Sequence, residues 1–424
     1  TKPNELRSYK LDYVAEQELG EKKLEHEEQS IWEMYEQDTD KLLRYNEKDV
    51  VLTKDVNEAA GILDFKQALR HEVGVDLDNT TANNEFIEMM VRRKLHERGL
   101  IAPDANYGND DSDYEGSFVF DAYSGVTSNV VGIDLASLYP YTMAMANASP
   151  ETKIDHAEKG EVGVVAMAPN DVAFDLTTDG IFKELIEDAI SLKSDYKEKR
   201  NSFAAGTPEH AKWSEKYAAA KTVTNSIYGV AGWSKFFLYD EEVAEAVTLL
   251  GQAAIKRTAK YINEETDGEV IYGDTDSCYL TLPDEWDKET CLEEAKTITQ
   301  KLNNDVYPSL AEEYGIPAED CLWDIEVESY MERYFQAGKK KRYAYIATWM
   351  DGKDCEPKLN ITGFDCQRSD TPLLTKELQE TAIKMILQGA SDSEIGEVVY
   401  EAATSITSES SDWNAIGLPG GLGQ

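Results

Sequence analysis

Apolar side chains recur at helical spacing in several long stretches of this chain, and these stretches predict most of its helices. Phe86, Ile87, Met90, Val91 and Leu95 fall on one face of a helix over residues 80–100, as expected where a helix packs one side against a core. Residues 1–60 also read as helical and acidic, and further helical stretches cover 240–265, 287–303 and 375–406. We therefore expect a chain rich in helix.

The longest helical pattern, over residues 180–228, is interrupted once, at residues 205–209. Within this interruption Gly206 suits the position after a helix end, Thr207 suits an N-cap, and Pro208 suits the first turn of a new helix. We therefore expect two antiparallel helices joined by a short turn.

Runs of β-prone residues lie between the helical stretches. They alternate with turns over residues 117–131, flank a tight turn at Asp274 and Asp276, and return across 321–365. The first of these regions leads directly into Asp134, and a cluster rich in Gly, Asn and Asp at 103–113 is expected to be a loop. Each of the three aspartates thus follows a β-prone run.

Length and composition set the class of protein. A chain of 424 residues with 41% hydrophobic residues suggests two to four domains. It contains no run of 18 apolar residues, so we expect no membrane span. Five scattered cysteines without a C-x-x-C pair indicate a reducing compartment and argue against a zinc or iron–sulfur site. Because the chain opens with Thr1 and has no signal-peptide pattern, we expect it to come from something longer.

The charge is unusual, because 82 acidic residues face 42 basic ones and give a net charge of −40. One interpretation is a protein that binds cations or basic partners. The other is a surface adapted to molar salt, where the Debye length is about 3 Å and self-repulsion is screened. The even spread of acidic residues along the chain favours salt adaptation, and hence a halophilic microbe or its virus.

The residue types themselves suggest phosphoryl chemistry. Asp134, Asp274 and Asp276 at strand ends suit hard divalent cations, which take oxygen ligands and bridge to substrate phosphates. Lys193 and Lys197 share one helical face of the predicted hairpin. Its second helix presents another face, formed by Lys221, Asn225 and Tyr228. If both faces point into one groove, three ammonium groups meet the metal-binding carboxylates, an arrangement that fits a triphosphate.

Several motifs resemble those of family B DNA polymerases, in the same order and spacing. Asp-Leu-Ala-Ser-Leu-Tyr-Pro at 134–140 and Tyr-Gly-Asp-Thr-Asp-Ser at 272–277 resemble the two metal-binding motifs of the family. The string 221–229 resembles the fingers motif, and 340–343 the motif that grips the primer end. Residues 114–117 and 363–372 are similar to elements that precede and follow the palm, with Ser117 where the family has glycine.

The resemblance implies an α+β fold, with an antiparallel palm sheet, packed helices and a helical-hairpin fingers insertion. It implies catalytic roles for Asp134, Asp274 and Asp276, with two Mg²⁺ ions (or Mn²⁺) held by Asp134, Asp276 and the Leu135 carbonyl. Asp274 would have the lesser role. The implied nucleotide-binding residues are Ser137, Leu138, Tyr139, Lys193, Lys197, Lys221 and Asn225. Tyr139 would exclude a 2′-hydroxyl.

Further implied roles concern DNA. Tyr228 and Gly229 would line the pocket of the new base pair, and the primer would be held by Lys340, Lys341, Arg342 and Tyr343. Where the family more often has Arg, Lys193 keeps the charge but loses the two-pronged hydrogen bonding of a guanidinium.

At the N-terminal end, Tyr45 and Asp49 resemble the third motif of the family's 3′–5′ exonuclease. The other exonuclease motifs are expected upstream of Thr1, so proofreading by this chain alone is not expected. Asp324-Ile325-Glu326 mimics the first such motif, but it lies in the palm region. We assign 1–80 to an exonuclease remnant, 81–176 to the linker and first palm part, 177–238 to the fingers, 239–372 to the second palm part, and 373–424 to a truncated thumb.

The sequence thus favours a template-directed DNA polymerase with primer–template DNA and deoxynucleoside triphosphates as partners. A sliding clamp or the missing polymerase segments are further expected partners, and no membrane is expected. The compartment would be the cytoplasm, or the host cytoplasm for a virus. Two alternatives stay open, namely a residual metal-dependent nuclease built on Tyr45 and Asp49, and a catalytically silent piece that assembles with a partner chain.

Overall fold

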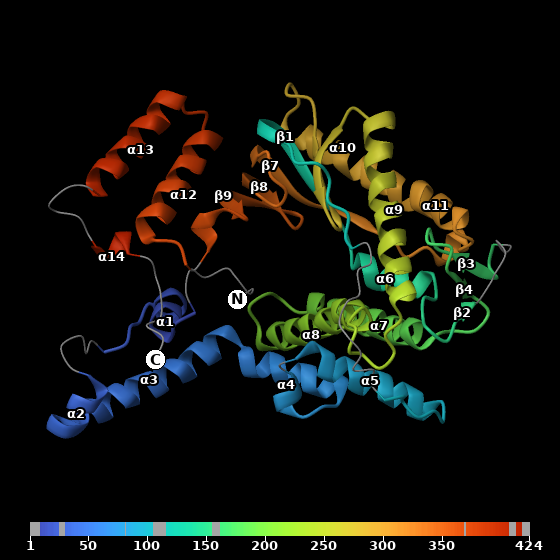
Figure 1. Ribbon diagram of the computed structural model, residues 1–424, viewed down its shortest axis with the longest axis horizontal. Coiled ribbons are helices and arrows are strands. Elements are labelled where there is room, and N and C mark those ends of the chain that lie inside the picture. The colour runs from blue at the N-terminus through green and yellow to red at the C-terminus, as the bar shows by residue number, and fades with distance from the viewer. Residues whose placement is uncertain are drawn as a thin grey trace.

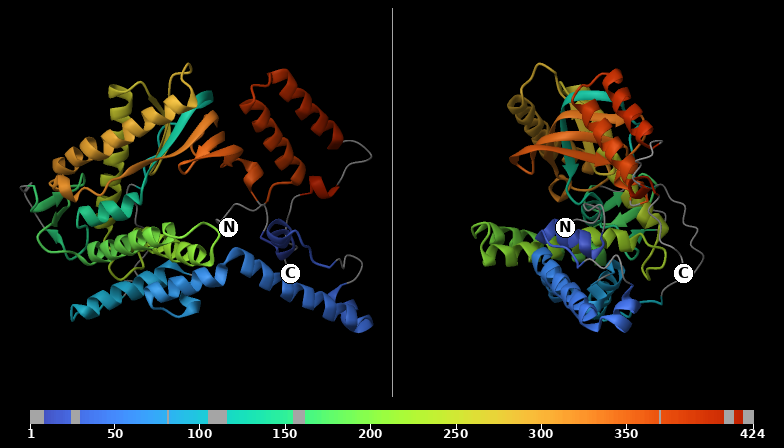
Figure 2. Two further views of the ribbon diagram at one scale, coloured as in Figure 1. Left: turned by 180° about the vertical axis from the view of Figure 1, so that it is seen from behind. Right: turned by 90° about the vertical axis from the view of Figure 1, so that its left-hand side faces the viewer.

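The computed structural model describes residues 9–24, 30–80, 82–104, 116–154, 162–368, 370–406 and 413–417. Three tiers are visible in Figure 1 and from behind in Figure 2. A β-sheet with its helices forms the upper tier, a helical hairpin the middle one, and the N-terminal helices the lower one.

The upper tier is built on a six-stranded antiparallel sheet with strand order β5-β6-β1-β7-β8-β9. Its strands are β1 (Ser124–Leu135), β5 (Glu269–Asp274), β6 (Ser277–Thr281), β7 (Ile325–Ala337), β8 (Tyr343–Met350) and β9 (Lys353–Thr362). Strand β1 is central and pairs with β6 on one side and β7 on the other. The expected β-prone regions are thus confirmed, although β1 begins later than the first of them.

Helices α9 (Glu241–Glu265) and α10 (Lys288–Lys301) pack against this sheet, and α10 continues through a π-helical turn (Leu302–Val306) into α11 (Tyr307–Glu313). The side chains of Asp240 and Asp287 accept hydrogen bonds from backbone N–H groups in the first turns of α9 and α10, which is how acidic N-caps stabilise helix starts. The expected helices at 240–265 and 287–303 are confirmed.

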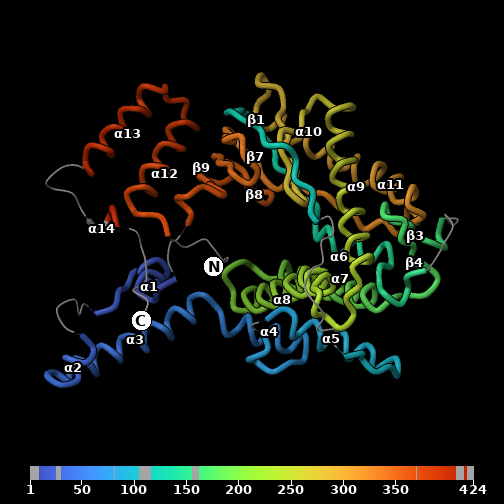
Figure 3. Tube along the Cα trace, viewed as in Figure 1, coloured from blue at the N-terminus to red at the C-terminus, as the bar shows by residue number. Residues whose placement is uncertain are grey.

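The expected hairpin is α7 (Ile181–Asn201) and α8 (Pro208–Ala231). Gly206 has a left-handed φ of 85°, and the Thr207 side chain caps α8 by accepting from the His210 N–H. Figure 3 traces β1 directly into α6 (Leu138–Met145), which lies between the sheet and the hairpin. A small sheet of β2 (Lys153–Ile154), β4 (Ala173–Asp175) and β3 (Val165–Met167) stands beside α6.

The lower tier contains α1 (Leu11–Leu19), α2 (Ile31–Gln37), α3 (Thr39–Ala60), α4 (Ile62–Val73), a 3₁₀ turn (Leu77–Thr80) and α5 (Asn83–Glu97). Helices α4 and α5 pack on α8, so the hairpin is held between two tiers. The sequence predicts α5 and the helical character of 1–60, but α4 was not predicted.

The C-terminal part forms α12 (Leu373–Leu387), α13 (Asp392–Ile406) and the short α14 (Trp413–Ile416), with 3₁₀ turns at Ala318–Asp320 and Asp365–Gln367 earlier in the chain. The expected helical stretch over 375–406 is confirmed and consists of two helices. It breaks at Gly389, whose φ is 80°, and a new helix begins where Ser391 and Glu394 hydrogen-bond reciprocally.

One large core joins the sheet, α6, the hairpin and the helices on either side. A second cluster, on the sheet itself, contains the tyrosines Tyr272, Tyr279 and Tyr334 with Tyr343 and Tyr345 packed against it. Among the described helices, none is both long enough and apolar enough to cross a bilayer.

Candidate active site

Asp134 lies near the end of the central strand β1, where the chain turns into α6. Its neighbours across the sheet are Ser277 on β6 and Glu326 on β7. The next residue, Leu135, donates its backbone N–H to the Asp276 carbonyl oxygen over 2.9 Å. This bond holds the two predicted metal-binding motifs side by side, 142 positions apart by residue number.

Asp274 ends β5, and Asp276 stands in the tight turn before β6. The Asp276 N–H donates to the Asp274 carbonyl over 2.8 Å. Between them Thr275 has a left-handed φ of 65°, an unusual conformation that clusters at functional sites. The Asp274 carboxylate accepts from the Thr275 hydroxyl over 3.1 Å and pairs with the Lys341 ammonium at 3.3 Å.

Burial raises the proton affinity of both Asp134 and Asp276 at this end of the sheet. Burial raises the pKa of Asp134 to about 8, with Asp276 and Glu328 adding to the effect and Lys221 opposing it. Burial also raises the pKa of Asp276, and Asp274 and Glu328 contribute. Two partly buried carboxylates whose charged forms are disfavoured by burial are a donor set that a divalent cation would stabilise, so these residues fit Mg²⁺.

The expected meeting of three carboxylates is only partly found. Over the part of the chain that the structure describes, no three His, Cys, Asp or Glu side chains are grouped closely enough to hold an ion. The contacts give a physical reason for the third carboxylate, because Asp274 forms an ion pair with the Lys341 ammonium. The pair Asp134 and Asp276 is the part of the predicted cluster that stays together.

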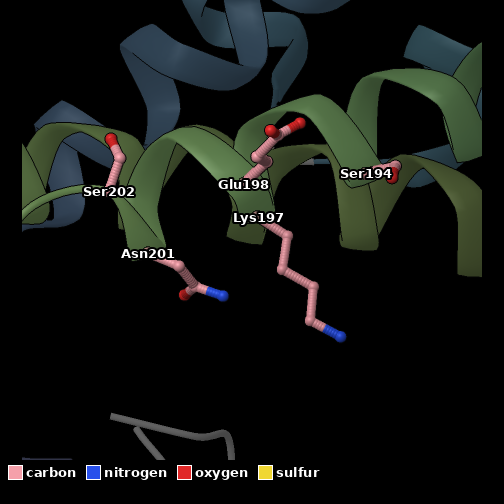
Figure 4. Close-up of a pocket in the computed structure, with 5 residues that line it drawn as sticks. All are labelled: Ser194, Lys197, Glu198, Asn201 and Ser202. Carbon is pink, nitrogen blue, oxygen red and sulfur yellow. The ribbon is translucent and has the colours of Figure 1, made fainter.

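The hairpin lysines face this acidic end of the sheet. Lys221 on α8 is close enough to Asp134 to oppose the rise of its pKa. Lys193 and Lys197 on α7 act in the same sense on Asp324, whose pKa burial and Glu326 raise. Figure 4 shows that Lys197 extends from α7 with its ammonium away from the helix. The structure therefore places Lys221 near the predicted carboxylate Asp134, whereas Lys193 and Lys197 lie near Asp324.

Direct contacts tie the start of α6 to α8. The Ser137 hydroxyl donates to the Asn225 side-chain oxygen over 2.8 Å, and the Tyr139 and Tyr228 rings lie 4.6 Å apart. Ser137 is the left-handed N-cap of α6, with φ 49°, and Leu138 after it is buried. Gly229 has open space where a side chain would be.

The predicted primer-gripping residues lie in the turn between β7 and β8. The Lys341 N–H donates to the Tyr272 hydroxyl over 2.8 Å, and the Tyr343 hydroxyl lies 3.2 Å from that of Tyr279. Lys340 donates to the Val119 carbonyl. The turn is thus hydrogen-bonded to β5 and β6, the two strands that flank Asp274 and Asp276.

The turn between β7 and β8 also contacts the residues that follow β9. The guanidinium of Arg342 lies 3.8 Å from an Asp365 oxygen. At Gly363, with φ 72°, a Cβ would stand 1.8 Å from the Lys341 carbonyl oxygen. Only glycine allows the two backbones to approach this closely.

Sequence reasoning missed two acidic residues at this site. Glu326 is directly opposite Asp134 in the β1–β7 register, and Glu328 contributes to the raised pKa values of both Asp134 and Asp276. The signal was present, because Asp324, Glu326 and Glu328 alternate along one strand and alternate residues share a face. The sequence mimic of an exonuclease motif therefore borders the palm aspartates.

With this geometry established, comparison with known proteins is decisive. The profile of the family described as "DNA polymerase family B" matches residues 79–414. The chain belongs to DNA polymerase family B. The expected α+β architecture is confirmed by a solved family B DNA polymerase from the hyperthermophilic archaeon Pyrobaculum calidifontis. It superposes with a TM-score of 0.69 at 25% identity, over 96% of this chain and 49% of that one.

Curated relatives agree with this membership of family B. A DNA polymerase of Archaeoglobus fulgidus is 28% identical over 82% of this chain and 40% of its own length. One from Thermococcus gorgonarius is 27% identical over 95% of this chain and 49% of its own. One from Paramecium bursaria Chlorella virus NY2A is 26% identical over 91% of this chain and 43% of its own. This family B chain spans less than half the length of these relatives.

The predicted exonuclease residues of this family B chain lie on α3, far from the palm in sequence. Tyr45 and Asp49 enclose the Lys23 ammonium, which is 2.6 Å from Asp49 and 5.1 Å from the centre of the Tyr45 ring. Asp49 is thus neutralised by a lysine. Of the other predicted motifs, Tyr114, Glu115 and Ser369 lie outside the described residues, as do 105–113 of the predicted loop and 418–424 of the glycine-rich tail.

Proposed function

We propose that this chain is the palm and fingers part of a template-directed DNA polymerase. It would join a deoxynucleotide to a primer 3′ end and release pyrophosphate. The observation that carries the proposal is the pair Asp134 and Asp276, which the Leu135–Asp276 hydrogen bond joins, with Lys221 of the hairpin near Asp134. Membership of family B supports the same reaction.

The proposed site would hold two Mg²⁺ ions (or Mn²⁺) through Asp134, Asp276 and the Leu135 carbonyl. Bound there, the metal lowers the pKa of the primer hydroxyl and neutralises charge on the phosphates. Lys193, Lys197 and Lys221 bind and orient the triphosphate, and they balance the charge that develops on it as the bond to the leaving group breaks.

Other residues position the reactants in this proposal. Tyr139, held against Tyr228, lies under the incoming sugar and selects deoxynucleotides, with Ser137, Leu138 and Asn225 beside it. Tyr228 and Gly229 line the pocket for the base pair. The primer is held by Lys340, Lys341, Arg342 and Tyr343. Of these, the Lys341 ammonium, which pairs with the Asp274 carboxylate, lies nearest to the turn that contains Asp274 and Asp276.

We also propose the domain limits given by the sequence, with 1–80 as an exonuclease remnant, 81–176 and 239–372 as the palm, 177–238 as the fingers and 373–424 as the start of a thumb. The contact of Asp49 with Lys23 supports a structural role for α3 over residual nuclease activity. A halophilic source and a sliding-clamp partner are proposed from charge and family alone.

Primer extension with Mg²⁺ and molar KCl tests the polymerase assignment. The wild-type chain should add the nucleotide complementary to the template, and Asp276→Asn should not. Asp351→Asn is the matched control, since it removes one carboxylate from an exposed turn residue with φ 49°, a conformation that Asn tolerates. Equal extension by Asp276→Asn would refute the assignment.

A second candidate is a role within a larger assembly; the chain spans 40% to 49% of the length of the three relatives described above. In that case the chain is a polymerase part that acts only with a partner chain. Extension that begins only when the remaining polymerase segments are added would select this candidate. Extension by the chain alone would exclude it.

A further inference from the structure

The lysine stripe of α7 continues beyond the two lysines assigned to the triphosphate. Arg200 follows Lys193 and Lys197 at the positions i, i+4 and i+7, which place all three on one helical face. At 1.5 Å per residue, Arg200 stands about 4.5 Å further along the axis than Lys197, toward the hairpin tip. Arg200 therefore adds a third cation to this face, on the side of the proposed triphosphate site that is nearer the hairpin tip.

Arg200 is held in a defined orientation. Its guanidinium lies 4.6 Å from the centre of the Tyr217 ring on α8, within the range of a cation–π contact. Its Nε and Nη2 groups both donate to the Asn201 side-chain oxygen at 3.1 Å. A guanidinium has five N–H donors, so three more remain for an oxyanion, and within the described residues no carboxylate forms an ion pair with it.

Tyr217 connects Arg200 with the lysine of the second helix. It precedes Lys221 by four residues, so both side chains lie on one face of α8. This face of α8 contains no acidic residue, and its members are His210, Ser214, Tyr217, Lys221, Asn225 and Tyr228. The stripe of α7 from Lys193 to Arg200 likewise has none, in a chain with 82 acidic residues.

The hairpin tip also departs from the charge of the whole chain. Residues 193–217 contain six basic and four acidic side chains, whereas the chain as a whole carries −40. A pocket on α7 is lined by Ser194, Lys197, Glu198, Asn201 and Ser202, so Lys197 borders it and Arg200 does not. In Figure 4 Lys197 and Asn201 project from one side of α7, while the Glu198 carboxylate projects from the other.

We propose that Arg200, stacked on Tyr217 and flanked by Lys197, forms an outer phosphate-binding site on the fingers. Its ligand is the phosphate chain of a nucleoside triphosphate approaching the palm, or of the pyrophosphate leaving it. A free phosphate chain fits better than a DNA backbone, because the site continues the stripe that would hold the triphosphate. The inference rests on the proposed function and adds a residue that it did not include.

The physical need for such a site follows from the net charge. A triphosphate approaching a protein with a net charge of −40 meets a repulsive field, and locally placed cations on its route raise its local concentration. This benefit is electrostatic and diminishes when salt shortens the Debye length to about 3 Å at 1 M. Arg200 should therefore affect the binding of phosphate chains more than the chemical step, and most strongly at low salt.

Equilibrium binding of magnesium pyrophosphate and of a deoxynucleoside triphosphate tests the proposal without requiring turnover. The measurement uses the full chain carrying Asp276→Asn, so it is informative even if the polymerase assignment fails. Arg200→Ala should raise the Kd for pyrophosphate about five- to tenfold at 0.1 M KCl, the loss expected for one charge-assisted hydrogen-bonded contact. Arg200→Lys should weaken pyrophosphate binding to an intermediate extent, since lysine keeps the positive charge but lacks the planar guanidinium that donates two parallel hydrogen bonds.

Lys212→Ala is the matched control. Lys212 is exposed and lies nine positions before Lys221, which places it on the opposite side of α8, and its loss should leave both Kd values unchanged. Losses for both ligands support a shared route, whereas a loss for one alone identifies that ligand as the occupant. Unchanged Kd values in Arg200→Ala would overturn the proposal, as would weaker binding of primer–template DNA alone.

Discussion

The raised pKa of Asp134 predicts that the active site destabilises the metal-free protein. Its carboxyl has a pKa of about 8 when folded, against 3.8 for an ordinary aspartate. Between these two pH values the folded chain retains a proton that the unfolded chain releases, so the free energy of unfolding falls as pH rises through the window. The side chain introduced by Asp134→Asn cannot ionise, so the free energy of unfolding of this variant should not fall in this way as pH rises.

The size of the effect follows from the shift. Each pKa unit corresponds to about 1.4 kcal/mol, so the whole window is worth about 6 kcal/mol at most. An assay that compares about pH 6 with about pH 8 samples two units, or about 2 to 3 kcal/mol. For 424 residues, an unfolding entropy of about 2 cal/mol/K per residue gives about 1 °C in Tm per kcal/mol, so the advantage of the variant over wild type should grow by about 2 to 3 °C.

The assay is thermal unfolding in EDTA at both pH values, for wild type, Asp134→Asn and the control Asp351→Asn. Both variants replace one Asp by Asn, and Asp351→Asn shows what the loss of an exposed carboxylate does to Tm at each pH. Mg²⁺ should then stabilise the wild type at the higher pH more than it stabilises Asp134→Asn. An advantage of Asp134→Asn that is no larger than that of Asp351→Asn, or that does not grow with pH, would refute the reasoning.

Three further predictions concern the turn behind the active site and the charge of the surface. Tyr272→Phe removes the hydroxyl that accepts from the Lys341 N–H. It should lower the free energy of unfolding by about 1 to 3 kcal/mol and weaken the binding of primer–template DNA. Unchanged affinity in a binding titration would contradict this prediction. Gly363→Ala should lower Tm sharply, because its Cβ would stand 1.8 Å from a carbonyl oxygen. Gly396→Ala should leave Tm unchanged, because a Cβ there points into open space on α13. Equal Tm values for the two variants would refute this prediction. Because the net charge is −40, Tm should rise between 0.1 and 3 M KCl, and a flat profile would remove the argument for salt adaptation.

The sequence predicted the parts of the site that depend on local signals. The hairpin could be predicted because Gly206, Thr207 and Pro208 each fit one position of a helix–turn–helix junction. Asp134 and Asp276 could be predicted because a carboxylate after a β-prone run stands at a strand end. The break between α12 and α13 also has a local cause, at Gly389, and a closer reading of residues 388–391 would have found it.

Other features depend on pairing between distant segments and could not be predicted in this way. The register of β1 against β7 places Glu326 opposite Asp134, and a shift of one residue would turn it to the other face. The contact of Lys341 with Asp274 depends on two turns that only the folded sheet brings together. Helix α4 buries Ala68, Leu69 and Val73 near α8, so its partner is also remote in sequence.

Binding of Mn²⁺, measured by the loss of its free-ion paramagnetic resonance signal at about pH 8 with a deoxynucleoside triphosphate present, tests the central claim most directly. The account predicts binding by the wild type that weakens by at least tenfold in both Asp134→Asn and Asp276→Asn and is retained in Asp351→Asn. If either active-site variant bound Mn²⁺ as tightly as the wild type, the two aspartates would not share a cation and the account would be contradicted.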